Sequence, residues 1–127
     1  MKFVDTDVLI DFYRKYQPAI DFLDYYYSRN EILAISPITQ VELYVGCRNK
    51  GELTETVKFL EQYKVVHFSS SISRKTIELI REYNLSHGLL IADAIIAATV
   101  LISEGELFSK NANHFMFIED LSVTKPY

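Results

Sequence analysis

The sequence lacks the features that mark secreted and membrane proteins. Cys47 is the only cysteine among 127 residues, so no intramolecular disulfide can form, which fits a reducing compartment. Residues Met1 to Phe12 are not expected to form a secretory signal, because acidic residues interrupt the apolar stretch. The longest apolar run, Leu89 to Ile102, is shorter than the roughly 18 to 20 residues that span a bilayer. We therefore expect a cytoplasmic protein without a membrane segment.

The chain also has no excess of basic residues. It carries 13 Lys and Arg against 17 Asp and Glu, which gives a net charge of −4. A protein that holds nucleic acid by its overall charge is normally basic. The composition therefore counts against a general nucleic-acid binder. It remains compatible with an enzyme whose acidic site is neutralised by a metal ion.

Strand-like and helix-like segments alternate along the chain. The expected strands are Lys2 to Val4, Ile32 to Ser36, Lys64 to Phe68, Glu106 to Ser109 and Leu121 to Thr124. Helices are expected between them, the first with Thr6 as its N-cap and the last, Leu90 to Ser103, almost entirely apolar. Asn84 to Gly88 is predicted to be a loop. This alternation predicts one α/β domain, residues 1–127, with a parallel sheet covered on its faces.

Asp93 is the most informative residue of the sequence. It is the only charged residue between Leu89 and Ile102, in a helix predicted to be buried on every side. A buried carboxylate costs several kcal/mol unless it is paired, protonated, hydrogen-bonded or bound to metal. Capping of backbone amides in the first helical turn explains Asp93 equally well when it is taken alone.

Two further acidic positions stand out. Asp5 follows a buried strand and precedes a helix, and the carboxyl ends of parallel strands are where ligands bind in open α/β sheets. The alternative is that Asp5 to Asp7 only begins a helix. Glu42 is the only charged residue between Ile32 and Cys47, and by itself it reads more simply as the solvated face of a helix.

Asp5, Glu42 and Asp93 matter more together than separately. Each is an isolated acid near a strand end or a helix start of one predicted sheet. Such oxygen ligands suit Mg²⁺ or Mn²⁺, and a divalent cation removes the repulsion between neighbouring carboxylates. A metal held in this way activates water and stabilises the charge of an in-line phosphodiester displacement. The residues thus predict an acidic metal site for phosphoryl chemistry.

Four segments resemble, in order, the four motifs of PIN domains, especially those of VapC-like toxins. They are Phe3 to Asp11, Ser36 to Leu43, Leu90 to Thr99, and Phe108 to Phe115. The resemblance spans essentially the whole chain. It implies a three-layer α/β/α sandwich with a mostly parallel sheet, and a metal-dependent endoribonuclease that acts on RNA. It also implies a toxin inhibited by a small antitoxin protein, and frequent homodimerisation.

The resemblance also assigns residue roles. It places Asp5, Glu42 and Asp93 in the catalytic metal site, with Mg²⁺ or Mn²⁺ as cofactor. Ser109 stands where the family often has threonine, and Asn111 matches an asparagine that would hold Asp5 or a metal-bound water.

The resemblance is least complete at His114, which stands where many members carry a fourth acid. Three roles are open for His114: it ligates a metal, it contacts a phosphate, or it has no role in the chemistry. We expect the last, with His114 packed against its neighbours or exposed on the surface. Asp7 is interpreted as auxiliary to the site. Asp11 is expected on the helix surface.

Two other functions remain open at this point. The first is a catalytically weak interaction module that keeps the fold and the partner surface, which the histidine at position 114 and the negative charge allow. The second is a haloacid-dehalogenase-like phosphatase, because Asp5 to Asp7 resembles the two-acid opening of that family. No convincing catalytic lysine motif follows, and the chain is short for such an enzyme.

Overall fold

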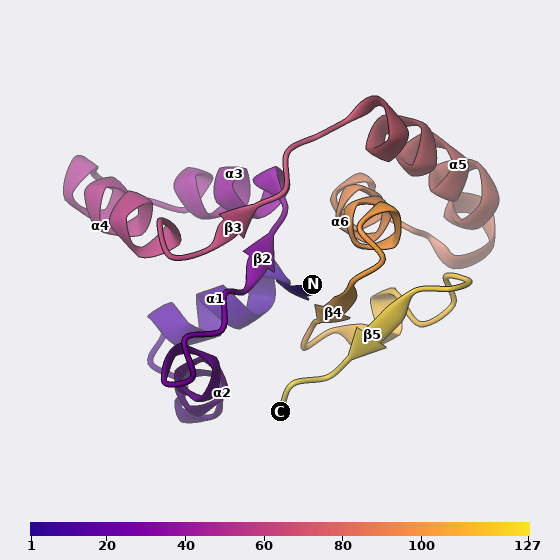
Figure 1. Ribbon diagram of the computed structural model, residues 1–127. Helices are drawn as coiled ribbons and strands as arrows, with labels where there is room; N and C mark the ends of the chain where they lie inside the picture. Colours follow the sequence, from indigo (N-terminus) through magenta and orange to yellow (C-terminus); the bar gives the residue numbers. More distant parts are fainter.

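The computed structural model describes residues 1–127 as alternating strands and helices (Figure 1). The strands are β1 (Lys2–Val4), β2 (Ala34–Ile35), β3 (Lys64–Val65), β4 (Glu106–Phe108) and β5 (Ser122–Thr124). The α-helices are α1 (Thr6–Tyr13), α2 (Gln17–Tyr27), α3 (Pro37–Val45), α4 (Lys50–Leu60), α5 (Ser70–His87) and α6 (Ile91–Ile102). A 3₁₀ turn, η1 (Ala112–His114), follows β4.

The five strands form one sheet in the order β3-β2-β1-β4-β5, and every pair is parallel. The central strand β1 pairs Phe3 with Ala34 on one side and with Leu107 on the other. Parallel neighbours need crossover connections, and helices supply most of them here. The α/β class predicted from the alternation of segments is confirmed, although the strands β2 and β3 are shorter than expected.

Alternate residues of the strands build two apolar layers, one on each face of the sheet. Phe3 and Leu107 point into a core formed with α5 and α6. Val4, Ile35 and Phe108 point the other way, into a core formed with α1, α2 and α3. In Figure 1, α5 and α6 lie on one side of the row of strands and α1 and α2 on the other. The expected three-layer α/β/α sandwich is therefore confirmed.

Two helix boundaries differ from the expectation. Asp5, not Thr6, caps α1, because the Asp5 side chain accepts the backbone N–H of Thr6. The predicted loop from Asn84 to Gly88 is the last turn of α5, which ends only at Gly88 in a left-handed conformation. Leu85 is the only strongly apolar residue of this turn, and it is 98% exposed. The turn therefore has no inward-facing apolar residue that would continue the helical pattern in the sequence.

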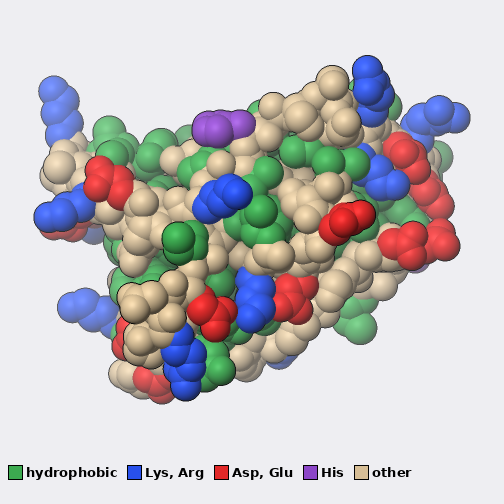
Figure 2. Space-filling view, in the orientation of Figure 1, with side chains coloured by type: hydrophobic (Ala, Val, Ile, Leu, Met, Phe, Trp, Pro, Cys, Tyr) green, Lys and Arg blue, Asp and Glu red, His purple; other side chains and the backbone are tan.

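The helix α6 is buried along most of its length, as predicted, but not at its beginning. Residues from Ala94 to Val100 are mostly enclosed, whereas Leu90 and Ile91 are exposed, Ile91 to 72%. Asp93 therefore lies at the point where the helix leaves the surface. None of the helices combines the length and the apolar character that crossing a membrane requires. On the face shown in Figure 2, acidic and basic side chains are interspersed without a broad basic patch.

Candidate active site and metal centre

The predicted acids gather where the strands β1, β2 and β4 end. Asp5 follows β1 directly, Ser36 follows β2 and caps α3, and Ser109 follows β4. Because the sheet is parallel, the carboxyl ends of these strands meet at one edge. The N-terminal ends of α1 and α3 begin at the same edge and carry Asp7 and Glu42 toward it. The local fold thus explains why residues distant in sequence share one site.

Asp5 is a buried carboxylate held by two hydrogen bonds. Its side chain is almost enclosed, with 7% of the residue exposed. The backbone N–H of Thr6 donates to Oδ1 at 2.8 Å, and the Ser109 hydroxyl donates to Oδ2 at 2.7 Å. Burial, followed by repulsion from Asp7, raises the pKa of Asp5 from 3.8 to about 7, and Asp93 adds a smaller contribution. A nearby cation would reverse this cost.

Asp7 is held by the loop that follows β4, which we call the 109–111 loop. The backbone N–H of Lys110 donates to Asp7 Oδ1 at 3.3 Å. Asn111 donates to Oδ2 through its backbone N–H at 3.1 Å and through its side-chain amide at 3.0 Å. Asn111 was expected to hold Asp5 or a bound water, but its partner is Asp7. Burial raises the pKa of Asp7, although these donors oppose the shift.

Glu42 is oriented by a chain of two hydroxyls that sequence reasoning did not find. The Thr6 hydroxyl lies 2.8 Å from Glu42 Oε1 and 3.0 Å from the buried Thr39 hydroxyl. A carboxylate accepts only, so the single Thr6 proton goes to Glu42 and Thr39 donates to Thr6. Glu42 itself is exposed. The signal available in the sequence was Thr39, a polar residue three positions before Glu42 on the same helix face.

Asp93 approaches the other acids from α6. Burial raises the pKa of Asp93; His114 opposes this, and Glu42 and Asp7 add to it. The Nδ1 atom of His114 lies 3.9 Å from Asp93 Oδ2, and the His114 side chain is 54% exposed. Of the two preferred expectations for His114, packing or exposure, its position agrees with exposure; its role toward a metal stays a prediction. The first-turn placement of Asp93 agrees with a dipole contribution, although its side chain accepts no backbone hydrogen bond to cap α6.

The structure brings all the predicted site residues to one edge, but it does not form a closed metal cage. No three His, Cys, Asp or Glu side chains converge closely enough to hold one metal ion. Mg²⁺ is commonly bound through one or two carboxylates, with water and substrate phosphate completing its shell. A set of oxygen donors fits such an ion when burial raises the pKa of Asp5, Asp7 and Asp93 and repulsion between the acids adds to the shift of Asp5 and Asp93.

Asp11 is buried beside the site, so the expectation of a surface residue is wrong. It is 6% exposed and accepts hydrogen bonds from the ammonium of Lys110 and from the phenol of Tyr127. Asp11 lies four residues after Asp7 on one face of α1, and this spacing was the available signal. Tyr127 lies 116 positions away, a separation that no local pattern reveals.

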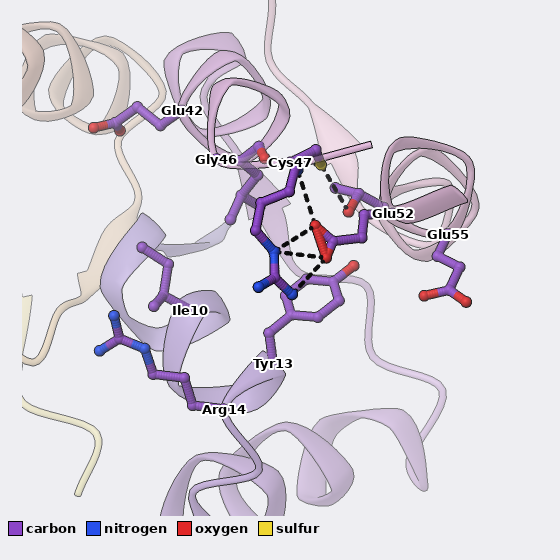
Figure 3. A pocket seen from close by; sticks show the side chains of 11 residues that line it. Ile10, Tyr13, Arg14, Glu42, Gly46, Cys47, Glu52 and Glu55 are labelled. Atoms are coloured by element: carbon purple, nitrogen blue, oxygen red, sulfur yellow. Dashed lines mark hydrogen bonds and ion pairs between the residues drawn. The ribbon is translucent and has the colours of Figure 1, made fainter. Parts of the chain in front are cut away.

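A pocket of about 660 Å³ opens beside Glu42, between α1, α3 and α4 (Figure 3). In Figure 3, Glu42 stands at one side of the pocket, apart from Glu52 and Glu55. Arg48 pairs with Glu52 at 3.1 Å, while Arg14 also lines the pocket. The pocket therefore offers open space and charges of both signs next to the acidic site.

Comparison with known proteins points to one family. The PIN domain family model matches residues 2–116. Ribonuclease VapC19 of Mycobacterium tuberculosis is 30% identical over 122 residues, covering 95% of this chain and 97% of the relative. Ribonuclease VapC10 of the same organism is 33% identical, covering 95% and 90%. A toxin–antitoxin complex from Klebsiella pneumoniae contains a chain with a TM-score of 0.84 and 29% identity, covering 100% of this chain and 98% of that chain.

Proposed function

This chain belongs to the PIN-domain family, and on that basis we propose that it is a metal-dependent endoribonuclease, the toxin of a toxin–antitoxin pair. Its relatives named as ribonucleases align over nearly the whole chain and support an RNA-cleaving hydrolase. The observation that carries the proposal is the meeting of Asp5, Asp7, Glu42 and Asp93, from three separate helices, at one sheet edge.

The cofactor that we propose is Mg²⁺ or Mn²⁺, held by Asp5 and Asp93, with the exposed Glu42 as an orienter of bound water, or as a further ligand after its side chain moves toward the bound ion. When bound, such an ion supplies a Lewis acid and a water of lowered pKa. Asp5 is fixed before any ligand arrives, because Thr6 and Ser109 both donate to it. The hydroxyl of Thr6 keeps Glu42 turned toward the N-terminal end of α1. These contacts limit the reorganisation that substrate binding requires.

The two alternative functions have less support. The match to the PIN family over residues 2–116 speaks against a haloacid-dehalogenase-like phosphatase. A catalytically weak module would have no reason to assemble repelling carboxylates in a buried position. The histidine at position 114 is compatible with the site, because the hydrogen bonds to Asp5 and Glu42 come from Thr6 and Ser109 and not from His114.

The activity is tested with purified chain and a structured RNA. We expect cleavage with Mg²⁺ or Mn²⁺, loss of cleavage with a chelator, and loss of at least about 100-fold in Asp93→Asn. Glu61→Gln, an exposed acid at the end of α4, is the control and should cleave normally. If Asp93→Asn cleaves as fast as the unchanged chain, either the site is misassigned or the activity belongs to a contaminant.

The proposed inhibitor is a small antitoxin protein. The resemblance to a chain from a toxin–antitoxin complex supports such a partner. A short reading frame immediately upstream that overlaps or abuts this one should encode it. Co-expression of the two should yield a stable complex without ribonuclease activity. Full activity in the purified complex would contradict inhibition.

We further propose that the chain forms a homodimer through the face made by the start of α5 and the start of α6. Phe68 and Ile77 are exposed there, and Ile91 is exposed one helical turn before Ile95 on α6. Phe68 and Ile77 line an apolar cavity of about 270 Å³ that Ile95 also lines. Soluble chains rarely leave a contiguous apolar patch uncovered, and two copies of the same patch would cover each other about a two-fold axis.

The oligomeric state tests this proposal directly. Light scattering after size exclusion should give twice the chain mass, and Ile77→Lys should give a single chain mass. Leu85→Lys is the control, because Leu85 is also an exposed apolar residue of α5 but does not line the cavity. This variant should leave the dimer intact. A single chain mass for the unchanged protein at micromolar concentration would rule the dimer out.

A further inference from the structure

We propose that Asp11, Lys110 and Tyr127, here called the anchor, position the 109–111 loop over Asp5 and Asp7 and thereby set the affinity of the site for a divalent cation. This inference rests on the proposed metal site. None of the three residues belongs to the set expected to touch the metal. Their contact with the site runs through the backbone of Lys110.

The anchor begins with a carboxylate that the fold has enclosed. Asp11 Oδ1 accepts from the Lys110 ammonium at 3.1 Å, and Oδ2 accepts from the Tyr127 phenol at 2.8 Å. The ammonium also lies 3.0 Å from Oδ2. A carboxylate this well buried is tolerated only when it is paired and hydrogen-bonded. Asp11 therefore holds both partners, because loss of either one would leave its buried carboxylate less well paired.

Lys110 connects the anchor to the acidic site in a single residue. Its side chain reaches Asp11, while its backbone N–H donates to Asp7. Both acids lie on one face of α1, one turn apart, so the loop is attached to this helix at two successive points. On either side of Lys110, Ser109 donates to Asp5 and Asn111 donates to Asp7. An error in the placement of Lys110 would disturb every one of these donors.

Tyr127 holds the far side of Asp11. Its ring packs edge-on against Tyr16 and Phe22, with centroid distances of 5.7 and 6.4 Å. This packing does not need the phenol oxygen, so the hydrogen bond to Asp11 is separable from it. Tyr127→Phe therefore removes the anchoring contact while it changes neither charge nor ring volume.

The test measures the affinity of the full chain for Mn²⁺ by titration calorimetry. The melting temperature in the presence of a chelator serves as the separate measure of stability. Tyr127→Phe should weaken Mn²⁺ binding about three- to tenfold, the range for one lost hydrogen bond. Tyr16→Phe removes a neighbouring phenol that has no contact with Asp11 and should bind Mn²⁺ unchanged. A lower melting temperature with unchanged Mn²⁺ affinity in Tyr127→Phe would overturn the inference.

Lys110→Met separates positioning from simple electrostatics. Removal of a cation beside the site should by charge alone strengthen Mn²⁺ binding, whereas loss of the anchor should weaken it about tenfold. Lys110→Arg should restore most of the affinity because it restores the pairing with Asp11. Stronger binding in Lys110→Met would overturn the inference. Absence of Mn²⁺ binding in the unchanged chain would instead show that the proposed metal site is wrong.

Discussion

The two halves of the acidic site are built differently. Asp5 is enclosed and Asp7 is half-buried, and together they accept hydrogen bonds from Thr6 and from all three residues of the 109–111 loop. Glu42 is exposed and has one hydroxyl partner, and the only side-chain interaction of Asp93 is with His114 at 3.9 Å. The first half is rigid before any ligand arrives, and the second half keeps freedom to move.

The two halves of the acidic site also differ in electrostatic cost. The rigid half carries the higher electrostatic cost, since the pKa of Asp5 rises to about 7. If the proposed Mg²⁺ binds, the looser half would leave room for the water and the substrate phosphate that this ion prefers in its shell. Changes in the rigid half should therefore affect both stability and activity, whereas changes in the looser half should affect activity alone.

The largest expected effect is that of Asp5→Asn. This variant should lose at least about 100-fold in RNA cleavage because it removes a proposed metal ligand. Without metal it should nevertheless be more stable than the unchanged chain at pH 8, by on the order of 2 to 4 kcal/mol, because it no longer buries a repelled carboxylate. Chemical unfolding in chelator measures this difference. If Asp5→Asn is equally or less stable than the unchanged chain, burial of the Asp5 carboxylate does not cost the free energy of folding proposed here.

The pH dependence follows from the same shift. The folded-state pKa of Asp5, about 7, lies above its unfolded value of 3.8, so the folded chain binds more protons between these limits. The free energy of unfolding of the metal-free chain should therefore fall as the pH rises from about 4 to about 7. The stability gain of Asp5→Asn should shrink toward zero near pH 4. A gain that is independent of pH would show that Asp5 is not the group responsible.

An intermediate effect is expected from Thr6→Val, which removes the hydroxyl that orients Glu42. Cleavage should fall about tenfold, in the range for the loss of a residue that orients a ligand. Thr6→Ser should restore it, because serine keeps the donor to Glu42. Cleavage rates at saturating Mn²⁺ distinguish the two variants. If Thr6→Val and Thr6→Ser lose the same activity, the methyl group and not the hydroxyl is important.

The smallest effect is expected from His114→Ala. Because His114 is exposed and lies 3.9 Å from Asp93, its loss should reduce cleavage at pH 8 by less than about threefold. His114 opposes the rise in the pKa of Asp93, so its removal should move the acidic limb of the pH–rate profile to higher pH. A loss as large as that of Asp93→Asn would instead make His114 a fourth member of the metal site.

The sequence predicted the acids better than the groups that hold them. Asp93 was visible because an apolar helix surrounds it, and Asp5 because it follows a buried strand. The donors to Asp7 lie more than 100 residues away, and nothing local links them. The expectation of a surface position for Asp11 was wrong because the residues that cover it, Lys110 and Tyr127, lie about 100 or more positions further along the chain. The short helix α1 alone does not reveal which of its acids becomes buried.

The alternation of segments likewise predicted the parallel sheet but not every boundary. The last turn of α5 has no apolar residue that packs inward, so only the left-handed Gly88 marks its end. The beginning of α6 was expected to be buried because its residues are apolar. Its exposed Ile91 shows that the hydrophobicity of a residue alone does not establish that the residue is buried in the core.

The hydrogen bond from Ser109 to Asp5 joins residues 104 positions apart, and β1 finds its partner β4 only at residues 106–108. During translation, Asp5, a proposed metal ligand, is therefore synthesised long before β4 and Ser109, which hold it in place. While the chain is being synthesised, the message that encodes it is exposed to a nascent protein that lacks its assembled site. For an enzyme that is proposed to cut RNA, this order of synthesis delays activity until translation has passed the 109–111 loop.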